Sequence, residues 1–255
     1  MSAPASSSLA VLAVLVTGAG RGLGRSVALT LASRGALLAV IDLDAPSAHR
    51  TVQEISHAGG QARAYAADVS DRAAFAAAAA DFAAAHGRID AVVNNAMLLK
   101  YEPIEAVSES VLDRMLAIGI KGAVWGAQLL LAHRDPSRPG CIINMASPVA
   151  ERGYPNTSIY SLVKGAMVTL TRTLAAELGP RGVRVNAVAP GSVPTPGAVG
   201  LNDPAEYERR SRTIPLRRLG HEDDHANAVA FLLSPQASFI HGEILHVDGG
   251  ITAAG

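Results

Sequence analysis

Seven short apolar runs alternate with longer amphipathic segments along the chain. Most of these runs are apolar on both faces, which is typical of a strand buried between two helical layers. Strands are predicted at 11–17, 37–42, 62–66, 91–94, 141–145, 184–189 and 244–247. Helices are predicted at 23–34, 46–58, 71–86, 108–133, 159–179 and 222–233. Right-handed crossovers then give an α/β fold, a Rossmann-like doubly wound parallel sheet of about seven strands with helices on both faces.

The 255 residues suit one such domain. We expect residues 1–8 to form a short disordered leader. No linker rich in Pro, Gly or Ser divides the rest of the chain, so we expect a single dinucleotide-binding and catalytic domain at 9–255. One long irregular segment, 191–220, follows a predicted strand and contains a short charged helix near 205–212. Loops of this length are usually functional, which favours a substrate lid.

Composition excludes several classes of partner. Basic and acidic side chains balance at 22 each, so there is no electrostatic reason to expect nucleic acid or an acidic membrane. The apolar run at 9–16 is too short to span a bilayer. A lone cysteine, Cys141, suits a reducing compartment. We therefore expect a cytoplasmic protein that binds neither nucleic acid nor membrane.

A glycine-rich turn separates the first predicted strand from the first helix. It reads Thr17-Gly18-Ala19-Gly20-Arg21-Gly22-Leu23-Gly24. Glycines in this position let the backbone turn tightly and approach a pyrophosphate, whose charge rests on the helix N-terminus. The turn therefore predicts a dinucleotide site.

The second predicted strand ends in Asp42, about twenty residues after the turn. A carboxylate there can accept hydrogen bonds from the adenosine ribose hydroxyls and would repel a 2′-phosphate. Arg21 has the opposite preference, because a basic residue in the turn can contact a 2′-phosphate. The fixed carboxylate is closer to the ribose, so NAD is favoured over NADP.

Ser147, Tyr160 and Lys164 place a hydroxyl, a phenol and an ammonium in one short stretch. Residues four apart on a helix share a face, and a nearby lysine can lower the pKa of a tyrosine towards a useful acid/base range. Ser147 could then hold the oxygen that gains or loses the proton. The three together fit reversible carbonyl–alcohol chemistry.

His221-Glu222-Asp223-Asp224-His225 matches a zinc-binding helical pattern. His221 directly follows Gly220, however, so it is expected at the helix N-cap, and acidic residues suit the first helical turn. No metal site is predicted.

Taken together, these motifs resemble the short-chain dehydrogenase/reductase family over nearly the whole chain, from about Leu9 to Gly250. Further matching segments are Asp68-Val69, Asn94-Asn95-Ala96, Pro190-Gly191-Ser192-Val193-Pro194-Thr195 and Leu245-His246-Val247-Asp248-Gly249-Gly250. The resemblance implies that Tyr160 is the acid/base, that Ser147 orients the carbonyl oxygen and that Lys164 binds the nicotinamide ribose. It also implies a tetramer or dimer built on the two long helices. The cofactor-binding residues that it implies, with those of the turn, are Gly18, Arg21, Gly22, Leu23, Gly24, Asp42, Asp68, Val69, Asn95, Ala96, Tyr160, Lys164, Pro190, Gly191, Val193 and Thr195.

Two positions depart from the family pattern. Gly119 stands where the family has an asparagine that anchors a proton-relay water, and Met97 stands where Asn-Asn-Ala should continue with glycine. We expect Met97 to narrow the nicotinamide pocket or shift the ring, and Gly119→Asn to raise proton-dependent rates or leave them unchanged.

The leading hypothesis is an NAD-dependent oxidoreductase that interconverts a small-molecule secondary alcohol and a ketone. Two alternatives stay open. One is a non-redox enzyme on the same scaffold, a dehydratase, isomerase or cyclase, which Gly119 and Met97 motivate. The other is a dinucleotide-binding regulatory protein.

Overall fold

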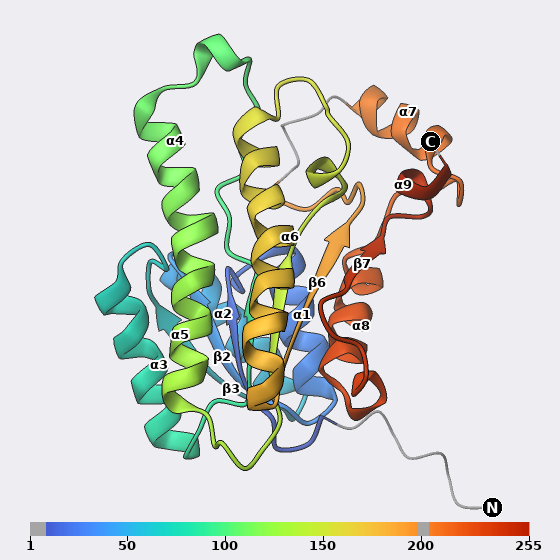
Figure 1. Cartoon of the computed structure of the whole chain (residues 1–255). Helices are drawn as coiled ribbons and strands as arrows, with labels where there is room; N and C mark the ends of the chain where they lie inside the picture. The colour runs from blue at the N-terminus through green and yellow to red at the C-terminus, as the bar shows by residue number, and fades with distance from the viewer. Residues whose placement is uncertain (1–8, 198–203, 255) are drawn as a thin grey trace, which may run out of the picture.

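The computed structural model describes residues 9–197 and 204–254, which form one sheet covered by helices (Figure 1). The expected leader at 1–8 and part of the expected lid, 198–203, lie outside the described residues. All strand pairs are parallel, in the order β3-β2-β1-β4-β5-β6-β7. The strands are β1 (Ala13–Thr17), β2 (Leu37–Asp42), β3 (Gln61–Ala66), β4 (Ala91–Asn94), β5 (Gly140–Met145), β6 (Val183–Pro190) and β7 (Ile244–Val247). The predicted fold class is therefore confirmed, and the order reverses between β1 and β4, where open α/β sheets bind ligands.

Helices cover both faces of this sheet. Alternate strand residues point to opposite sides, so Val14 and Val16 pack under one helical layer while Ala13 and Leu15 pack under the other. The first layer consists of α1 (Gly22–Ser33), α2 (Ala45–His57) and α8 (Glu222–Leu233). The second consists of α3 (Arg72–His86), α4 (Glu109–Leu116), α5 (Gly122–His133) and α6 (Ser158–Leu178). Two short helices, α7 (Pro204–Thr213) and α9 (Ile251–Ala254), lie beyond β6 and β7.

The predicted helix 108–133 is not one regular α-helix. A π-helical turn, η2 (Ala117–Lys121), joins α4 to α5, and Gly119 lies buried in it. The apolar periodicity continues through this turn, so the sequence pattern alone did not reveal it. Such turns inside α-helices are frequent at functional sites.

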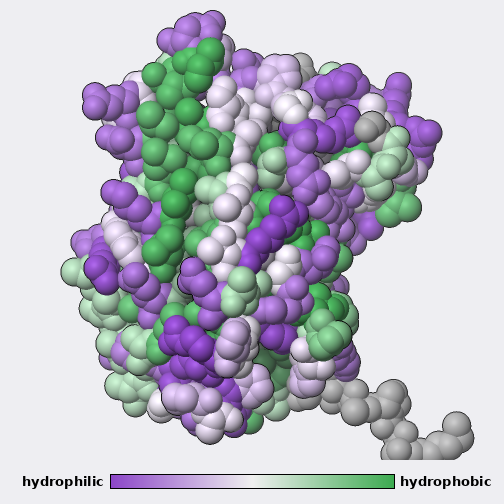
Figure 2. Space-filling view, in the orientation of Figure 1, coloured by the Kyte–Doolittle hydropathy of each residue, from purple (hydrophilic) through white to green (hydrophobic). Residues whose placement is uncertain are grey.

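The combined segment Glu109–His133 is long and apolar enough to cross a membrane by length and composition, and 44% of its most apolar window is buried inside the protein. Its other side contributes to a continuous apolar strip on the surface over α4 and α5 (Figure 2). Leu112 and Leu116 of α4 are half-buried. On the neighbouring α6, Leu162 is exposed.

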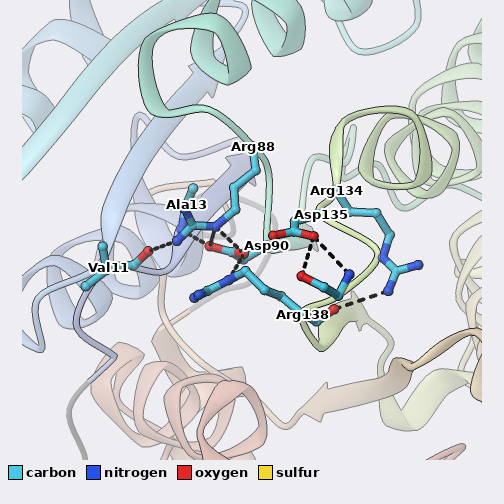
Figure 3. A network of polar contacts seen from close by, with 8 residues as sticks. Val11, Ala13, Arg88, Asp90, Arg134, Asp135 and Arg138 are labelled. Atoms are coloured by element: carbon cyan, nitrogen blue, oxygen red, sulfur yellow. Dashed lines mark hydrogen bonds and ion pairs between the residues drawn. The ribbon is translucent and has the colours of Figure 1, made fainter.

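A charged network closes the amino end of the sheet (Figure 3). The buried carboxylate of Asp90, just before β4, accepts a hydrogen bond from the Ala13 backbone amide at 2.9 Å. Arg88 donates to the same carboxylate at 2.8 Å and to the Val11 carbonyl at 2.9 Å, and Arg138 approaches it at 3.5 Å. Asp90 thereby ties β1, β4 and the approach to β5 together, at the edge opposite the predicted site.

Candidate active site

The three predicted catalytic side chains meet at the carboxyl end of the sheet. Ser147 lies two residues beyond β5, and Tyr160 and Lys164 lie in the first two turns of α6. The Lys164 ammonium donates to the Met145 carbonyl at 2.6 Å and lies 5.6 Å from the centre of the Tyr160 ring. The chain thus brings together residues from a strand end and a helix start, as parallel sheets do.

The pKa of Tyr160 moves in the opposite direction to the one expected. Desolvation of the phenol raises its pKa, Tyr101 raises it further, and the Ser147 hydroxyl lowers it. Lys164 does not offset desolvation, because its ammonium is turned to the Met145 carbonyl. The expectation that Lys164 lowers the Tyr160 pKa is therefore wrong when only the side chains of the protein are considered.

Lys164 is itself strongly desolvated. Its side chain is buried, and burial lowers its pKa to about 8. Within the described residues its ammonium pairs with no carboxylate and donates only to a backbone carbonyl. A buried cation with so little compensation is typical of a functional group.

A buried series of side-chain hydrogen bonds, which the sequence analysis missed, supports this site. The Asn94 amide donates to Asn144 Oδ1 at 2.9 Å, and the Asn144 amide donates to Thr171 Oγ1 at 2.9 Å. Thr171 in turn donates to the Met167 carbonyl. The series joins β4, β5 and α6, so it fixes Ser147 relative to Tyr160. Polar residues within apolar strands were the sign that could have revealed it.

Tyr101 borders the catalytic phenol. Its ring packs edge-on against Tyr160, with centroids 5.5 Å apart. The contact puts an aromatic ring directly beside Tyr160.

Gly119 and Met97 form one packed unit below Lys164. A Cβ at Gly119 would lie 2.3 Å from Val163 Cγ1 and 3.1 Å from Met97 Sδ. A cavity of about 10 Å³ remains between these residues and Lys164, the size of one water. The Met97 sulfur therefore points towards the π-helical turn, and Val163 occupies the space that a side chain at position 119 would need.

The glycine turn has the features that a pyrophosphate needs. Gly18 and Gly22 have positive φ angles of 63° and 57°. A Cβ at Gly24 would lie 2.1 Å from the Gly18 carbonyl oxygen, so only glycine allows α1 to start this close to β1. No side chain caps the N-terminus of α1, and its amides suit an anion. The turn fits a dinucleotide.

Asp42 is anchored beside that turn. Its Oδ2 accepts a hydrogen bond from the Gly20 amide at 2.8 Å, and its Oδ1 accepts one from the Asp44 amide at 3.0 Å. Arg21, by contrast, is exposed. The carboxylate is thus held in place at the end of β2, whereas the guanidinium extends into solvent.

Two other predicted cofactor residues are engaged by the chain itself. The Asn95 amide donates to the Thr17 carbonyl at 2.8 Å and to the Gly18 carbonyl at 3.1 Å, so it braces the glycine turn. Asp68 accepts hydrogen bonds from Ser70 and from Arg114. Desolvation opposes them, but these bonds lower the pKa of Asp68. Arg114 was missed by the sequence analysis.

The remaining predicted residues lie around the same edge. Val69 packs against Gly122, and a Cβ at Gly22 would lie 3.4 Å from Thr195 Cβ, so the stretch after β6 reaches the glycine turn. The Ala96 amide donates to Thr17 Oγ1 at 3.0 Å. The others at this edge are Leu23 at the start of α1 and Pro190, Gly191 and Val193 at the end of β6 and just beyond.

The zinc-like pattern is a helix start, as expected. His221 is the N-cap of α8, and its ring accepts a hydrogen bond from the Asp223 amide. His221 is exposed while His225 is 1% exposed, so the two imidazoles do not share a face. Among the described residues no group of three or more His, Cys, Asp or Glu could hold a metal ion.

Comparison with known proteins decides the family. Residues 18–252 match a family model described as enoyl-(acyl carrier protein) reductase. The chain is also 36% identical over 245 residues to 2-(S)-hydroxypropyl-CoM dehydrogenase 3 of Xanthobacter autotrophicus, covering 94% of this chain and 96% of that protein. The chain belongs to the short-chain dehydrogenase/reductase family.

Solved structures of this family superpose closely on the chain. A 7α-hydroxysteroid dehydrogenase with NADH and 7-oxo glycochenodeoxycholic acid has a TM-score of 0.92 at 33% identity, covering 96% of this chain and 95% of that one. A structure described as a 2-deoxy-D-gluconate 3-dehydrogenase from Agrobacterium tumefaciens, with bound NADP, has a TM-score of 0.88 at 33% identity. The match covers 98% of this chain and 100% of that one. Relatives of this short-chain dehydrogenase/reductase are thus oxidoreductases that bind either nicotinamide cofactor.

Proposed function

We propose that this chain interconverts a secondary alcohol and a ketone, using NAD in preference to NADP. The observation that carries the proposal is the meeting of Ser147, Tyr160 and Lys164 with the glycine turn at one edge of the sheet. The relatives named hydroxypropyl-CoM and hydroxysteroid dehydrogenase support an alcohol substrate.

Each protein group has a distinct task in this proposal. Ser147 holds the substrate oxygen, and Tyr160 donates a proton to that oxygen in the reducing direction or accepts one in the oxidising direction. The nicotinamide supplies hydride transfer when bound, and its oxidised ring adds a positive charge. Such a charge near the phenol opposes the desolvation that raises the Tyr160 pKa. Lys164, whose ammonium donates to the Met145 carbonyl, would hold the nicotinamide ribose.

The preference for NAD rests on Asp42. Its carboxylate is held by two backbone amides beside the glycine turn, where the adenosine ribose of a dinucleotide lies in this type of fold. A fixed negative charge there repels a 2′-phosphate, whereas Arg21 is exposed and is not held against it.

A screen of secondary alcohols and ketones, followed by the absorbance of reduced nicotinamide, tests the reaction. NADH and NADPH are compared at equal concentration. Asp42→Ala should lower kcat/KM with NADH by about tenfold or more, because charged hydrogen bonds contribute about 1.5–3 kcal/mol. Asp44→Ala, in the exposed residue two positions later, is the matched control and should change it little. A clear preference of the wild type for NADPH would overturn the cofactor assignment.

We favour the redox reaction over the non-redox alternative. Gly119 and Met97 motivated it, and the two residues pack together with Val163 below an intact Ser/Tyr/Lys group. Binding of NAD without turnover of any alcohol or ketone in the screen would restore the alternative.

A homo-oligomer, a tetramer or a dimer, is part of the same proposal. The apolar strip over α4 and α5 supports it (Figure 2), together with the exposed Leu162 on α6. A second copy covering this face would remove it from water. Light scattering of the purified protein tests this, and a monomer at micromolar concentration would contradict it.

A further inference from the structure

The segment that carries Ser147, residues 147–152, is one continuous hydrogen-bonded turn, called the serine turn below. Ser147 caps the short helix η3 (Pro148–Ala150), and its carbonyl accepts a hydrogen bond from the Ala150 amide at 3.0 Å. The Pro148 carbonyl accepts one from the Arg152 amide, also at 3.0 Å. A displacement of Arg152 is therefore passed to Ser147 through the hydrogen-bonded backbone of this turn.

The side chain of Arg152 joins the serine turn to α9. Its Nη1 donates to the Ile251 carbonyl at 2.7 Å, and the side chain is half-buried. Next to it, Glu151 Oε2 lies 3.4 Å from His246 Nε2 on β7. Two consecutive side chains thus hold the serine turn to the last strand of the sheet and to the helix that follows it.

The acceptor carbonyl on α9 is itself held in place. Asp248 accepts hydrogen bonds from the Gly250 amide at 2.8 Å and from the Thr252 amide at 3.0 Å. Asp248 is buried, and a Cβ at Gly191 would lie 2.7 Å from Asp248 Cα, so the end of β7 packs closely against the end of β6. Ile251 therefore presents its carbonyl to Arg152 from an anchored turn.

Apolar packing does not fill the space beside these contacts. A cavity of about 830 Å³ opens there, and its lining includes Glu151 of the serine turn, His246 of β7 and Thr252 and Ala253 of α9. Where side chains do not interlock, a hydrogen bond is the contact that fixes the distance between two segments. The bond from Arg152 to α9 is such a contact.

We propose that Arg152 is a positioning residue, whose hydrogen bond to the Ile251 carbonyl holds the serine turn so that Ser147 meets the substrate oxygen beside Tyr160. Misplacement of a catalytic group by about 1 Å costs about 10²-fold in rate, so a link outside the reacting atoms is enough to control turnover. The proposal rests on the proposed function, in which Ser147 holds that oxygen, and it adds a residue to the same site.

The first test measures turnover of the ketone from the screen that the wild type reduces fastest. Arg152→Ala should lower kcat and kcat/KM together by about tenfold, because a displaced hydroxyl loses a contact made mainly in the transition state. The dissociation constant of NADH should change less than about twofold, because the glycine turn and Asp42 lie at β1 and β2. Arg152→Lys keeps a cationic donor and should recover part of the rate.

Arg134→Ala is the matched control at the amino end of the sheet (Figure 3). Arg134 is also half-buried, and its Nη2 also donates to a backbone carbonyl, that of Arg138, at 3.2 Å. Urea unfolding should show similar losses of stability in the two alanine variants, while kcat of Arg134→Ala stays within about twofold of the wild type. Equal rate losses in both variants would show that Arg152 acts only through overall stability, and would overturn the proposal.

A double-mutant cycle with Ser147→Ala tests the route of the effect. If Arg152 acts through Ser147, Arg152→Ala should lower kcat of the Ser147→Ala enzyme by less than about twofold, because no hydroxyl remains to be misplaced. Losses that multiply in the double variant would show that Arg152 affects the rate independently of Ser147, and the positioning role would fall.

Amide hydrogen exchange with NADH bound separates this proposal from the proposed reaction. Arg152→Ala should speed exchange of the Ala150 and Arg152-position amides, which are bonded within the serine turn, and Arg134→Ala should not. Unchanged exchange, or faster exchange without a loss of kcat, overturns the positioning role and leaves the reaction in place. Faster exchange in a protein whose wild type reduces no ketone overturns the reaction but supports the link from Arg152 to the serine turn.

Discussion

The two ends of the sheet treat buried charge differently. At the amino end the Asp90 carboxylate accepts hydrogen bonds from a backbone amide and from Arg88, with Arg138 nearby. At the carboxyl end the buried Lys164 ammonium donates to one carbonyl, and desolvation raises the Tyr160 pKa and lowers the Lys164 pKa. At the amino end, a buried charge that other groups of the protein compensate holds the strands together. Ionisable groups that the protein leaves poorly compensated are available for chemistry.

Tyr160→Phe gives the largest expected effect and tests the carboxyl end alone. Removing the hydroxyl eliminates proton transfer, which general acid/base catalysis makes worth about 10²- to 10⁴-fold in rate. We expect kcat to fall by that factor, while the midpoint of thermal unfolding and the dissociation constant of the coenzyme stay nearly constant. Full activity in a folded variant that still binds coenzyme would remove Tyr160 from the chemistry.

Asp90→Ala tests the amino end and should have the opposite profile. It leaves the Ala13 amide without its acceptor and Arg88 without its carboxylate. Breaking a buried ion pair costs about 3–5 kcal/mol, and the partial exposure of Arg88 favours the lower figure. Urea unfolding should therefore show a loss of about 3 kcal/mol. The kcat of the remaining folded protein should stay within about twofold, and a rate loss as large as that of Tyr160→Phe would erase the contrast between the ends.

The cofactor side of the carboxyl end could be predicted from the sequence because backbone geometry dictates it. Glycines at 18, 22 and 24 are required by positive φ or by close approach of the backbone, and their spacing is visible in the chain. The catalytic side depends on side-chain packing between distant segments. The chain Asn94–Asn144–Thr171 and the contact of Gly119 with Val163 and Met97 join residues far apart in sequence. No local pattern contains them.

The direction of the Tyr160 pKa shift could not be predicted from the sequence either. A helical spacing of four correctly put Lys164 near the phenol, but not the direction of its ammonium. Spacing fixes which side chains are neighbours. Desolvation and the choice of hydrogen-bond partner depend on the surrounding fold, and these decided the direction of the shift.

Gly119→Asn sharpens the comparison within the carboxyl end, since it fills a packed junction. The added Cβ would lie 2.3 Å from Val163 Cγ1, and overpacking of this kind costs about 1–3 kcal/mol. We expect the free energy of unfolding to fall by that amount. Val163→Ala removes the opposing methyl groups, so the double variant should recover part of the loss in a double-mutant cycle. Strictly additive losses would show that Val163 does not occupy the space that asparagine needs.

His225→Leu has the smallest expected effect and concerns a third buried ionisable group, on α8. Neither ring nitrogen has a hydrogen-bond partner in the described part of the chain, and desolvation lowers the pKa from 6.5 to about 4. An unfolded chain therefore gains a proton below about 6.5 that the folded chain does not accept until about 4. Neutral His225 thus contributes stability above pH 6.5 that is lost as the pH falls through this window.

At pH 5.5 the wild type should have lost about 1.4 kcal/mol of unfolding free energy relative to the variant, because one pH unit corresponds to about that energy for one proton. Urea unfolding at pH 7.5 and 5.5 measures the difference, and His49→Leu, in an exposed histidine, is the control. Parallel losses in wild type and His225→Leu would mean that the folded protein accommodates the charged imidazole. Burial without a partner would then not by itself mark a group whose charge the fold excludes.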